Sequence, residues 1–379
     1  MTGTIPAVRE IVIVIADLYL PAGSTEAVAG TSGTSPGLEH ITRFGRRRAL
    51  DSENGWRGWL ARWVGAEGLA NTPPAAVAAA VLADQGVPST LWLATPVHLI
   101  AGLTSLHLDR RSLLQLSAAE LEGFAADFNQ TFGGDDPAAA LRLRPLLPSG
   151  QFLLQAPANL RATTTEPALA LVTDLEASLP KGPQAAPFKR LGAELEIWLH
   201  SHPLNEARRR RGELPVSTLW LWGGGPAPAP TATPAQAQGA SDPGARQDSA
   251  SRPDPVTMVF GNDAYLAGLS SVSGADVRAL PAELAQMIGH SQARRAVVVT
   301  ELTPLLHAQP QWTVFDAVAD LDHRYIAPAL TALTDGRLQG VSLIANNVEL
   351  RVERGDRLKF WRRRRPGLTG LTVDPAGTQ

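Results

Sequence analysis

Acidic and amide side chains follow each of the four apolar runs that we expect to form buried strands. They are Asp17, the pair Asn262 and Asp263, Glu301, and the pair Asn346 and Asn347. Ligands of open α/β sheets bind beyond the carboxyl ends of the strands, so these side chains would share one edge. Asp17, Glu301 and His307, which lies six residues beyond Glu301, are the candidate metal ligands, because divalent cations take carboxylate oxygen and imidazole nitrogen. The alternative is that an isolated acid after a strand caps a helix or belongs to a turn.

The four runs are rich in β-branched residues and lack polar alternation, which is typical of strands covered on both faces of a parallel sheet. They span residues 11–15, 256–260, 296–300 and 340–345. Segments with helical spacing separate the later runs, the longest over residues 312–334. Strands that alternate with helices predict an α/β fold with a mostly parallel sheet core.

The middle of the chain has a different pattern. Helices are expected over residues 117–132 and 186–200, and short strands over 91–94 and 151–155. Ser117 followed by Glu120 is a capping box, which begins the first of these helices. One core strand precedes this region and three follow it, so we predict a core interrupted by an inserted α+β domain. The expected boundaries are 1–85 and 256–366 for the two parts of the core, 86–225 for the insert, 226–255 for a linker and 367–379 for a tail.

The expected linker is dominated by Pro, Ala, Gly, Ser, Thr and Gln and has almost no large apolar residue. Such a segment buries too little surface to offset the entropy of ordering it, so we expect it to be flexible.

Composition narrows the classes of function. The formal net charge is −2, which argues against a nucleic-acid partner. The absence of cysteine excludes disulfides, thiolate nucleophiles and iron–sulfur clusters, so a metal would need His and carboxylate ligands. Residues 1–10 lack the features of a signal peptide, and the apolar stretch 11–16 is too short to cross a bilayer. We therefore expect a cytoplasmic protein without a transmembrane segment.

A basic run near the end of the chain, residues 359–365, contains Phe360 and Trp361 between Lys and Arg residues. Aromatic groups among basic ones could stack on bases or lie at a lipid surface. The alternative is the exposed end of a final strand.

The most distinctive segment is residues 199–225, with the sequence LHSHPLNEARRRRGELPVSTLWLWGGG. It resembles the H-P-x-N-x-x-R…G-x-x-P…W-L-W-G-x-G stretch of the archaeal-type 2,3-bisphosphoglycerate-independent phosphoglycerate mutases, which belong to the alkaline phosphatase superfamily. It is more similar still to their bacterial relatives, the RpfE-type regulatory proteins. The segments WLATPVH (92–98) and FNQTF (128–132) are also similar to the relatives. The resemblance extends well over residues 85–225 and weakly over 256–350.

The resemblance implies an alkaline phosphatase-like core with two divalent metals of the Mn or Mg type, a Ser that accepts the phosphoryl group, and an inserted substrate domain. Asp17 matches the first metal ligand and His307 keeps a loop histidine, but Thr303 stands in place of the loop aspartate. Asn346 and Asn347 stand in place of an Asp-His pair, and Ser52 is the nearest serine to the nucleophile by position alone. Lost carboxylates weaken the field that holds dications.

The expected function is therefore that of a pseudoenzyme, a phosphoglycerate mutase-like protein with a degenerate metal site that binds a small phosphorylated ligand or a protein partner in regulation. The alternative is an active phosphotransferase or mutase with a rearranged site, dependent on Mn or Mg. In the inserted region, the candidate phosphate-binding residues are His202, Asn205 and Arg208. His202 and Asn205 have an alternative structural interpretation, in which they satisfy backbone groups around the helix corner at Pro203. For Arg208, which begins the basic run 208–211, the alternative is a solvated face of the helix.

Overall fold

The computed structural model describes residues 8–20, 35–50, 52–82, 89–102, 106–136, 140–173, 175–226, 257–288, 293–356 and 367–371 of the 379-residue chain. The segment predicted to be a flexible linker, except residue 226, and the basic run 359–365 lie outside the described residues.

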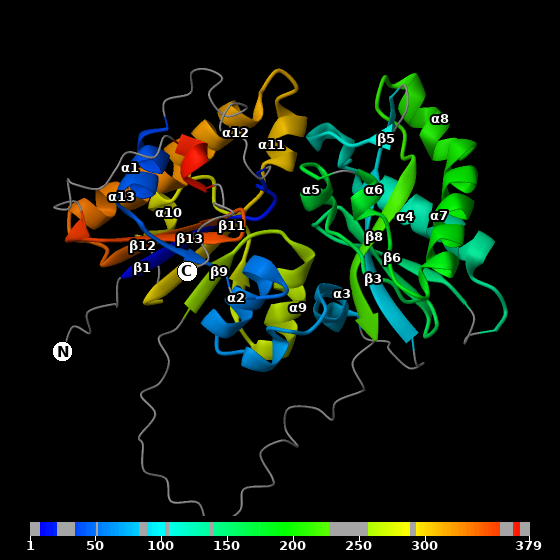
Figure 1. Cartoon of the computed structure of the whole chain (residues 1–379), viewed down its shortest axis with the longest axis horizontal. Coiled ribbons are helices and arrows are strands. Elements are labelled where there is room, and N and C mark those ends of the chain that lie inside the picture. The colour runs from blue at the N-terminus through cyan, green and yellow to red at the C-terminus, as the bar shows by residue number, and fades with distance from the viewer. Residues whose placement is uncertain are drawn as a thin grey trace, which may run out of the picture.

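The larger sheet has seven strands in the order β10-β9-β11-β1-β12-β13-β2, and the first five run parallel (Figure 1). The last two strands pair antiparallel at one edge. The strands are β1 (Glu10–Ile15), β2 (Arg46–Ala49), β9 (Thr257–Phe260), β10 (Asp276–Arg278), β11 (Arg295–Thr300), β12 (Gly340–Ala345) and β13 (Val348–Glu353). The prediction of an α/β fold with a mostly parallel core is confirmed.

A second sheet of four antiparallel strands is formed entirely by residues between β2 and β9. Its order is β6-β7-β3-β8, with β3 (Ser89–Val97), β6 (Arg142–Leu146), β7 (Gln151–Pro157) and β8 (Thr218–Pro226). A short hairpin, β4 (Ile100–Ala101) and β5 (Leu106–His107), lies beside it. The α+β insertion into the core is therefore present, and it forms a separate half of the molecule (Figure 1).

Helices cover the larger sheet on both faces (Figure 1). One face carries α1 (Pro36–Phe44), α10 (Ala285–Ile288), α11 (Thr303–Ala308), α12 (Val314–Leu321) and α13 (Ala327–Thr334). The other carries α2 (Gly55–Trp63), α3 (Pro74–Ala78) and α9 (Ala264–Ser273). The second sheet is accompanied by α4 (Ala118–Phe132), α5 (Pro167–Ala170), α6 (Leu175–Ser178), α7 (Ala185–His200) and α8 (Pro203–Arg210).

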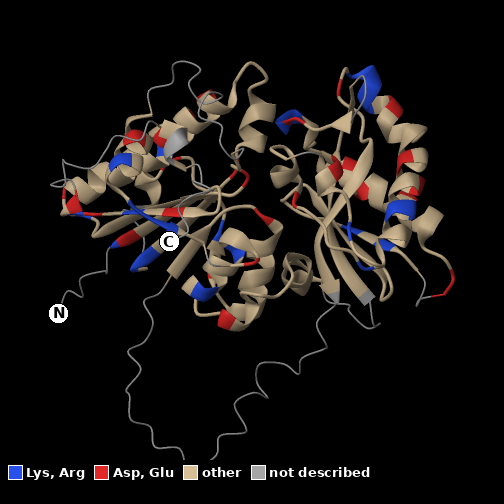
Figure 2. Cartoon of the chain, in the orientation of Figure 1, with Lys and Arg blue, Asp and Glu red and all other residues tan. Residues whose placement is uncertain are grey.

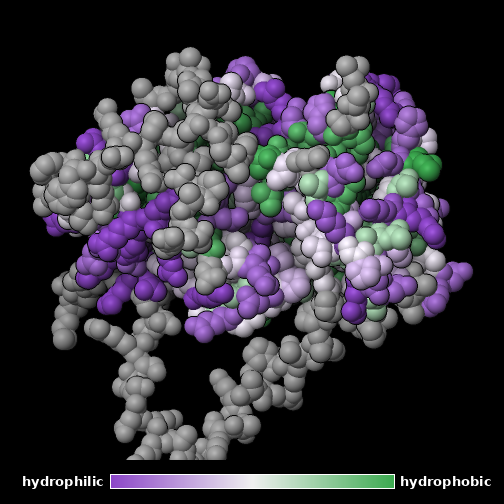
Figure 3. Space-filling view, in the orientation of Figure 1, coloured by the Kyte–Doolittle hydropathy of each residue, from purple (hydrophilic) through white to green (hydrophobic). Residues whose placement is uncertain are grey.

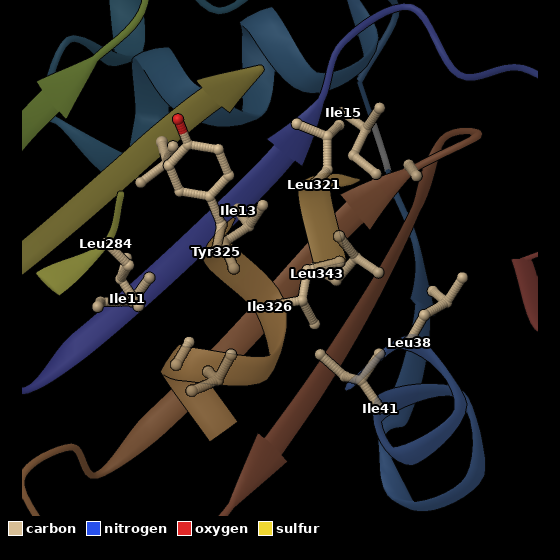
Figure 4. Close-up of a cluster of buried hydrophobic side chains, with 14 of the residues drawn as sticks. Ile11, Ile13, Ile15, Leu38, Ile41, Leu284, Leu321, Tyr325, Ile326 and Leu343 are labelled. Carbon is tan, nitrogen blue, oxygen red and sulfur yellow. The ribbon is translucent and has the colours of Figure 1, made fainter. Parts of the chain in front are cut away.

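Strand β1 lies at the centre of the core, and its alternate side chains are therefore buried on opposite faces of the sheet. Ile11, Ile13 and Ile15 pack against α12 and the helical segment that follows it (Figure 4). Val12 and Val14 pack on the other face against α2 and α9. Burying one such side chain stabilises the fold by about 1.5–3 kcal/mol, so this unbroken apolar run needs cover on both sides.

Helix boundaries follow the capping chemistry expected from the sequence. Ser117 and Glu120 form the capping box of α4, and Gly133 ends this helix. The long helix predicted over residues 312–334 begins at Val314 and consists of α12 and α13 joined by a π-helical segment, Asp322–Ile326. Asp322 there accepts hydrogen bonds from the backbone N–H groups of Gly37 and Leu38, at 3.1 and 2.7 Å, and so caps α1.

Several elements differ from the expectation. Helix α1 is absent from the sequence-based prediction, and its first turn is held by Asp322, a partner that is distant in sequence. Strand β13 is absent from the sequence-based prediction. It pairs with β12 through a two-residue turn made of Asn346 and Asn347, both with positive φ, of 51° and 57°. Positive φ at both central residues is the requirement of the tight hairpin turn that Asn and Gly favour.

No helix in the described part of the chain is long and apolar enough to cross a membrane.

The hairpin turn gives a stability prediction. Asn347 is exposed and holds a left-handed backbone conformation, so Asn347→Gly should leave the free energy of unfolding within about 0.5 kcal/mol of the parent. Asn347→Val should lower it by about 1–2 kcal/mol, because a β-branched residue clashes at positive φ. Urea denaturation of both variants measures the difference, and equal stabilities would show that the turn does not need this conformation.

Candidate functional site

Three carboxyl side chains meet at one edge of the larger sheet. Asp17 follows β1, Asp263 follows β9 and Glu301 follows β11, and these three strands are neighbours in the order β9-β11-β1. The carboxyl ends of neighbouring parallel strands lie together, so acids that follow such strands in the sequence lie close together in the structure. The edge faces the inserted half, and Figure 2 shows acidic residues on both sides of this junction.

A small cavity of about 60 Å³ lies at this junction. Asp17 and Glu301 line it from the core, and Glu166 and Trp222 line it from the inserted half. A water molecule occupies about 30 Å³ in the liquid, so the cavity holds only a few waters in this form of the protein.

Arg57 is the cation of this junction. It lies in the first turn of α2, is 4% exposed, and donates to Asp263 Oδ2 at 2.8 Å and to Glu166 Oε1 at 3.0 Å. Its guanidinium also lies over the rings of Trp56 and Trp222, at 4.4 and 4.9 Å from their centroids. A cation in the first turn of a helix is disfavoured by the helix dipole, so the helix itself does not explain why Arg57 lies there. The two carboxylates that it pairs with explain its position.

The same contacts set the protonation of Arg57. Burial by itself lowers the pKa of Arg57, but Asp263 and then Glu166 outweigh it, so its pKa lies above the usual value and the charge is permanent. Asp263 comes from the core and Glu166 from the inserted half, so one guanidinium joins the two halves.

Two tyrosines extend the network. The Tyr19 hydroxyl donates to Glu166 Oε2 at 2.9 Å, and burial followed by the charge of Glu166 raises the pKa of Tyr19 well above its usual value. The Tyr265 hydroxyl donates to the carbonyl oxygen of Arg57 at 3.2 Å. Asp263 caps α9 through Oδ1, which accepts from the backbone N–H of Tyr265 at 2.7 Å. Every carboxylate oxygen of Asp263 and Glu166 thus has a donor.

Glu301 lies in the same cavity, where the charge of Arg57 only partly offsets its neighbouring acids. Burial, followed by the charges of Asp263 and Asp17, raises the pKa of Glu301 to about 8. The side chain is therefore mostly protonated at neutral pH. A neutral carboxylic acid donates a hydrogen bond and is a weak ligand for a cation.

Asp17 is used to cap a helix. Its carboxylate accepts from the backbone N–H groups of Leu302 and Thr303, both at 2.8 Å, and from the Thr303 hydroxyl at 2.7 Å. Arg110 donates to the carbonyl oxygen of Asp17 at 2.6 Å, and its guanidinium lies 4.0 Å from Oδ2. A carboxylate offers about four acceptor positions, and the start of α11 fills three of them.

The remaining candidate ligands are engaged elsewhere. His307 Nε2 lies 2.8 Å from the carbonyl oxygen of Leu113 and so donates to it, and burial lowers the pKa of His307. The Asn346 side chain accepts from Leu20 N–H at 3.0 Å and donates to the carbonyl oxygen of Leu371 at 2.9 Å. Asn346 and Asn347 are therefore the hairpin turn described above.

A two-metal centre does not fit these residues. Within the described ranges, no group of three or more His, Cys, Asp or Glu side chains could hold a metal ion. The structure brings Asp17 and Glu301 to one cavity, whereas His307 is not among the residues that line it. Ser52 does not line it either. Its buried hydroxyl has no hydrogen-bond partner among the described residues and lies under Gly58, where an added Cβ would come within 2.0 Å of it.

The three candidate phosphate ligands of the inserted half all bind protein groups. Asn205, fully buried, donates to the carbonyl oxygens of Leu199 and Val216, at 2.7 and 2.8 Å, and accepts from Val216 N–H at 2.7 Å. His202 caps α8 by accepting from the Leu204 N–H at 3.2 Å. These contacts match the structural interpretation of the helix corner.

Arg208 is equally well occupied. Its Nε donates to the carbonyl oxygen of Leu214 at 2.8 Å and its Nη1 to Glu120 Oε1 at 2.9 Å. The phosphate-binding role of His202, Asn205 and Arg208 stays a prediction.

Sequence reasoning misses Arg57 and Glu166. Arg57 is surrounded in sequence by Trp56, Trp59 and Leu60, so the pattern indicates only an amphipathic helix. Its position in the first turn, where a cation opposes the dipole, is the signal that could have drawn attention to it. Glu166 lies in a segment without periodicity and carries no such signal.

Comparisons with known proteins find only distant similarity. No protein-family model matches the chain, and no curated protein matches it. Among solved structures, a cofactor-independent phosphoglycerate mutase from Thermoplasma acidophilum is similar with 15% identity and a TM-score of 0.35, over 92% of this chain and 90% of that one. The PH0037 protein from Pyrococcus horikoshii is similar with 12% identity and a TM-score of 0.43, over 92% and 88% of the two chains.

The ion pairs of Arg57 give a stability prediction. Arg57→Met leaves the buried Asp263 and the part-buried Glu166 without this cation, so it should lower the free energy of unfolding by about 3–5 kcal/mol. Arg337→Met is the matched control, because Arg337 pairs with Asp335 at an exposed site and its loss should cost less than about 1 kcal/mol. Adding Glu166→Gln and Asp263→Asn to Arg57→Met should recover part of the loss. Equal effects of the two Arg→Met substitutions, measured by urea denaturation, would contradict the central role of Arg57.

Glu301 gives a pH prediction. Its pKa is raised in the folded protein, so the folded state binds the extra proton and loses stability as the pH rises from about 4.5 to about 8. Glu301→Gln removes this loss and should exceed the parent in stability by up to roughly 5 kcal/mol at pH 8.5, with little difference at pH 4.5. Glu67→Gln, at an exposed position, is the control. Identical pH profiles of parent and Glu301→Gln, in denaturation at several pH values, would refute the prediction.

Proposed function

We propose that this chain is a phosphoglycerate mutase-like pseudoenzyme of the RpfE-type regulatory kind, which binds a ligand or partner and does not catalyse phosphoryl transfer. The observation that carries the proposal is the use of Asp17 as a helix cap: three hydrogen bonds from the start of α11 occupy the carboxylate that the resemblance assigns to a metal. The alkaline phosphatase-like character of the core is part of the same proposal.

The charges of the junction support it. Asp17, Asp263 and Glu166 contribute three negative charges, Arg57 and Arg110 contribute two positive ones, and Glu301 is mostly protonated. The guanidinium of Arg57 pairs with both Asp263 and Glu166 and so offsets part of the negative charge that would attract a dication. A cation could enter only by displacing Arg57, which would leave a buried charge without a partner.

The size of the cavity argues for a protein partner over a phosphorylated small molecule in this form of the protein. At about 60 Å³ it is too small for a phosphoglycerate, and its acids repel an anion. A phosphorylated ligand would need the two halves to separate at the Arg57–Glu166 contact. A small phosphorylated ligand is therefore the second class of partner that we consider, after a protein. The expected cytoplasmic location is compatible with either class of partner.

An active enzyme with a rearranged site, dependent on Mn or Mg, is the alternative. One observation favours it: Asp17 and Glu301 line the same cavity, and Asp263 is near enough to raise the pKa of Glu301. This arrangement would be a mutase or phosphatase centre if the carboxylates were released from their present donors.

Metal binding and catalytic activity distinguish the pseudoenzyme from the active alternative. The pseudoenzyme should gain no thermal stability from 1 mM MnCl₂, whereas a site with a dissociation constant near 10 μM would raise the melting temperature by roughly 5 °C. Elemental analysis after Mn loading should find no stoichiometric metal, and 2- and 3-phosphoglycerate should not interconvert.

Asp17→Asn is the control for this experiment. Loss of the helix cap should lower the melting temperature by the same amount in EDTA and in Mn²⁺. A Mn-dependent difference between parent and Asp17→Asn, or mutase turnover, would establish the active alternative.

A further inference from the structure

A second and much larger cavity lies in the inserted half, away from the Arg57 junction. Its volume is about 310 Å³, and it lies between α7 and β8 with α6 and the β4–β5 hairpin as further walls. Apolar side chains dominate the lining, among them Phe188, Leu219 and Trp220. Strand β8 is the edge strand of its sheet, so Leu219 and Trp220, on opposite faces, both reach the cavity.

Gly192 contributes to the open space of the cavity, because it has no side chain to fill it. It lies in the middle of α7, where glycine costs about 0.5–1 kcal/mol relative to alanine. A Cβ added at Gly192 would meet no heavy atom within 4 Å, so close packing does not demand the glycine. Gly123 in α4 is different, because its Cβ would lie 3.0 Å from Leu204. Gly192 lines the cavity, and the space beside it is the cavity itself.

The rim of the cavity is also apolar and exposed. Leu106 and Leu179, which are 48% and 41% exposed, both line it. Figure 3 shows hydrophobic side chains gathered on the part of the inserted half where α5, α6 and β5 lie. An exposed apolar patch around an open cavity is typical of a binding site.

Two charged side chains of α7 stand at the cavity without a hydrogen-bond or ion-pair partner among the described residues. Lys189 and Glu196 are two helical turns apart, so roughly 10 Å separates them along the axis. Lys189 lies in the second turn of α7 and supplies the positive charge at this end of the cavity. Burial raises the pKa of Glu196.

We propose that this cavity binds a small amphipathic carboxylate, with the apolar body beside Gly192 and the carboxylate at Lys189. An apolar cavity of about 150 Å³ holds benzene, so this one accepts roughly a two-ring aromatic body or a chain of about ten carbon atoms. Most ligand sites in proteins are of this size, lined by apolar groups with a few polar ones that set the orientation. The site goes beyond the proposed function, because it shares no residue with the Arg57 junction.

Calorimetric titration of the full chain with naphthalene-2-carboxylate and with decanoate tests the proposal. Both should bind with a negative heat-capacity change, which marks burial of apolar surface. Gly192→Leu fills the cavity and should weaken binding by at least about tenfold while it keeps or raises the melting temperature, since leucine is the better helix former. Glu194→Leu adds the same side chain at an exposed position of α7 that does not line the cavity and should bind as the parent does.

The head group is tested separately. Lys189→Gln should weaken binding of naphthalene-2-carboxylate by about threefold or more and leave the neutral naphthalene-2-carboxamide unaffected. Ala193→Phe is a second cavity-filling variant should Gly192→Leu fail to fold. Absence of binding to the parent, or equal binding by parent and filled variants, would overturn the site. Equal affinity for carboxylate, carboxamide and an alkylammonium would overturn the assignment of Lys189. None of these outcomes depends on metal or on mutase activity.

Discussion

A buried guanidinium pairs with a carboxylate from each half of this molecule. Arg57 comes from a helix of the core, yet one of its carboxylate partners, Glu166, and one of its stacked rings, Trp222, belong to the inserted half. A charge taken out of water costs several kcal/mol unless it is paired and fully hydrogen-bonded. The position of the inserted half is therefore coupled to the protonation and packing of Arg57, and the small size of the junction cavity follows from this closed arrangement.

The sequence predicts the core well because its strands are buried on both faces. Such strands need unbroken apolar runs, and the carboxyl ends of parallel neighbours must meet, so the positions of Asp17, Asp263 and Glu301 in the chain are enough to place them at one edge. The capping box of Ser117 and Glu120 is equally local. What the sequence could not supply is the partner of each acid, because Arg57 and Glu166 are 109 residues apart and neither is patterned.

The hairpin at Asn346 and Asn347 could have been predicted. Two asparagines between an apolar run and the alternating sequence VELRV are a known signal for a tight turn. The backbone of this hairpin requires positive φ, which Asn tolerates. The turn therefore explains the asparagines whether or not they stand in place of metal ligands. The turn alone explains both residues, and the contacts of Asn346 with Leu20 and Leu371 explain why the first is an amide.

Strand β8 separates two environments that differ in their chemistry. Trp222 stacks on Arg57 at the charged junction, whereas Leu219 and Leu221 line the apolar cavity at the open edge of the sheet. An edge strand has one side without a neighbouring strand, so its residues can serve a cavity that a central strand would close. Trp220 lies between the two, lining the cavity while its indole N–H donates to the carbonyl oxygen of Thr165, next to Glu166. A ligand in the cavity would thus contact the residue that fixes the segment carrying the second carboxylate of Arg57. The apolar cavity and the charged junction are physically connected through that segment, although they recognise different chemistry.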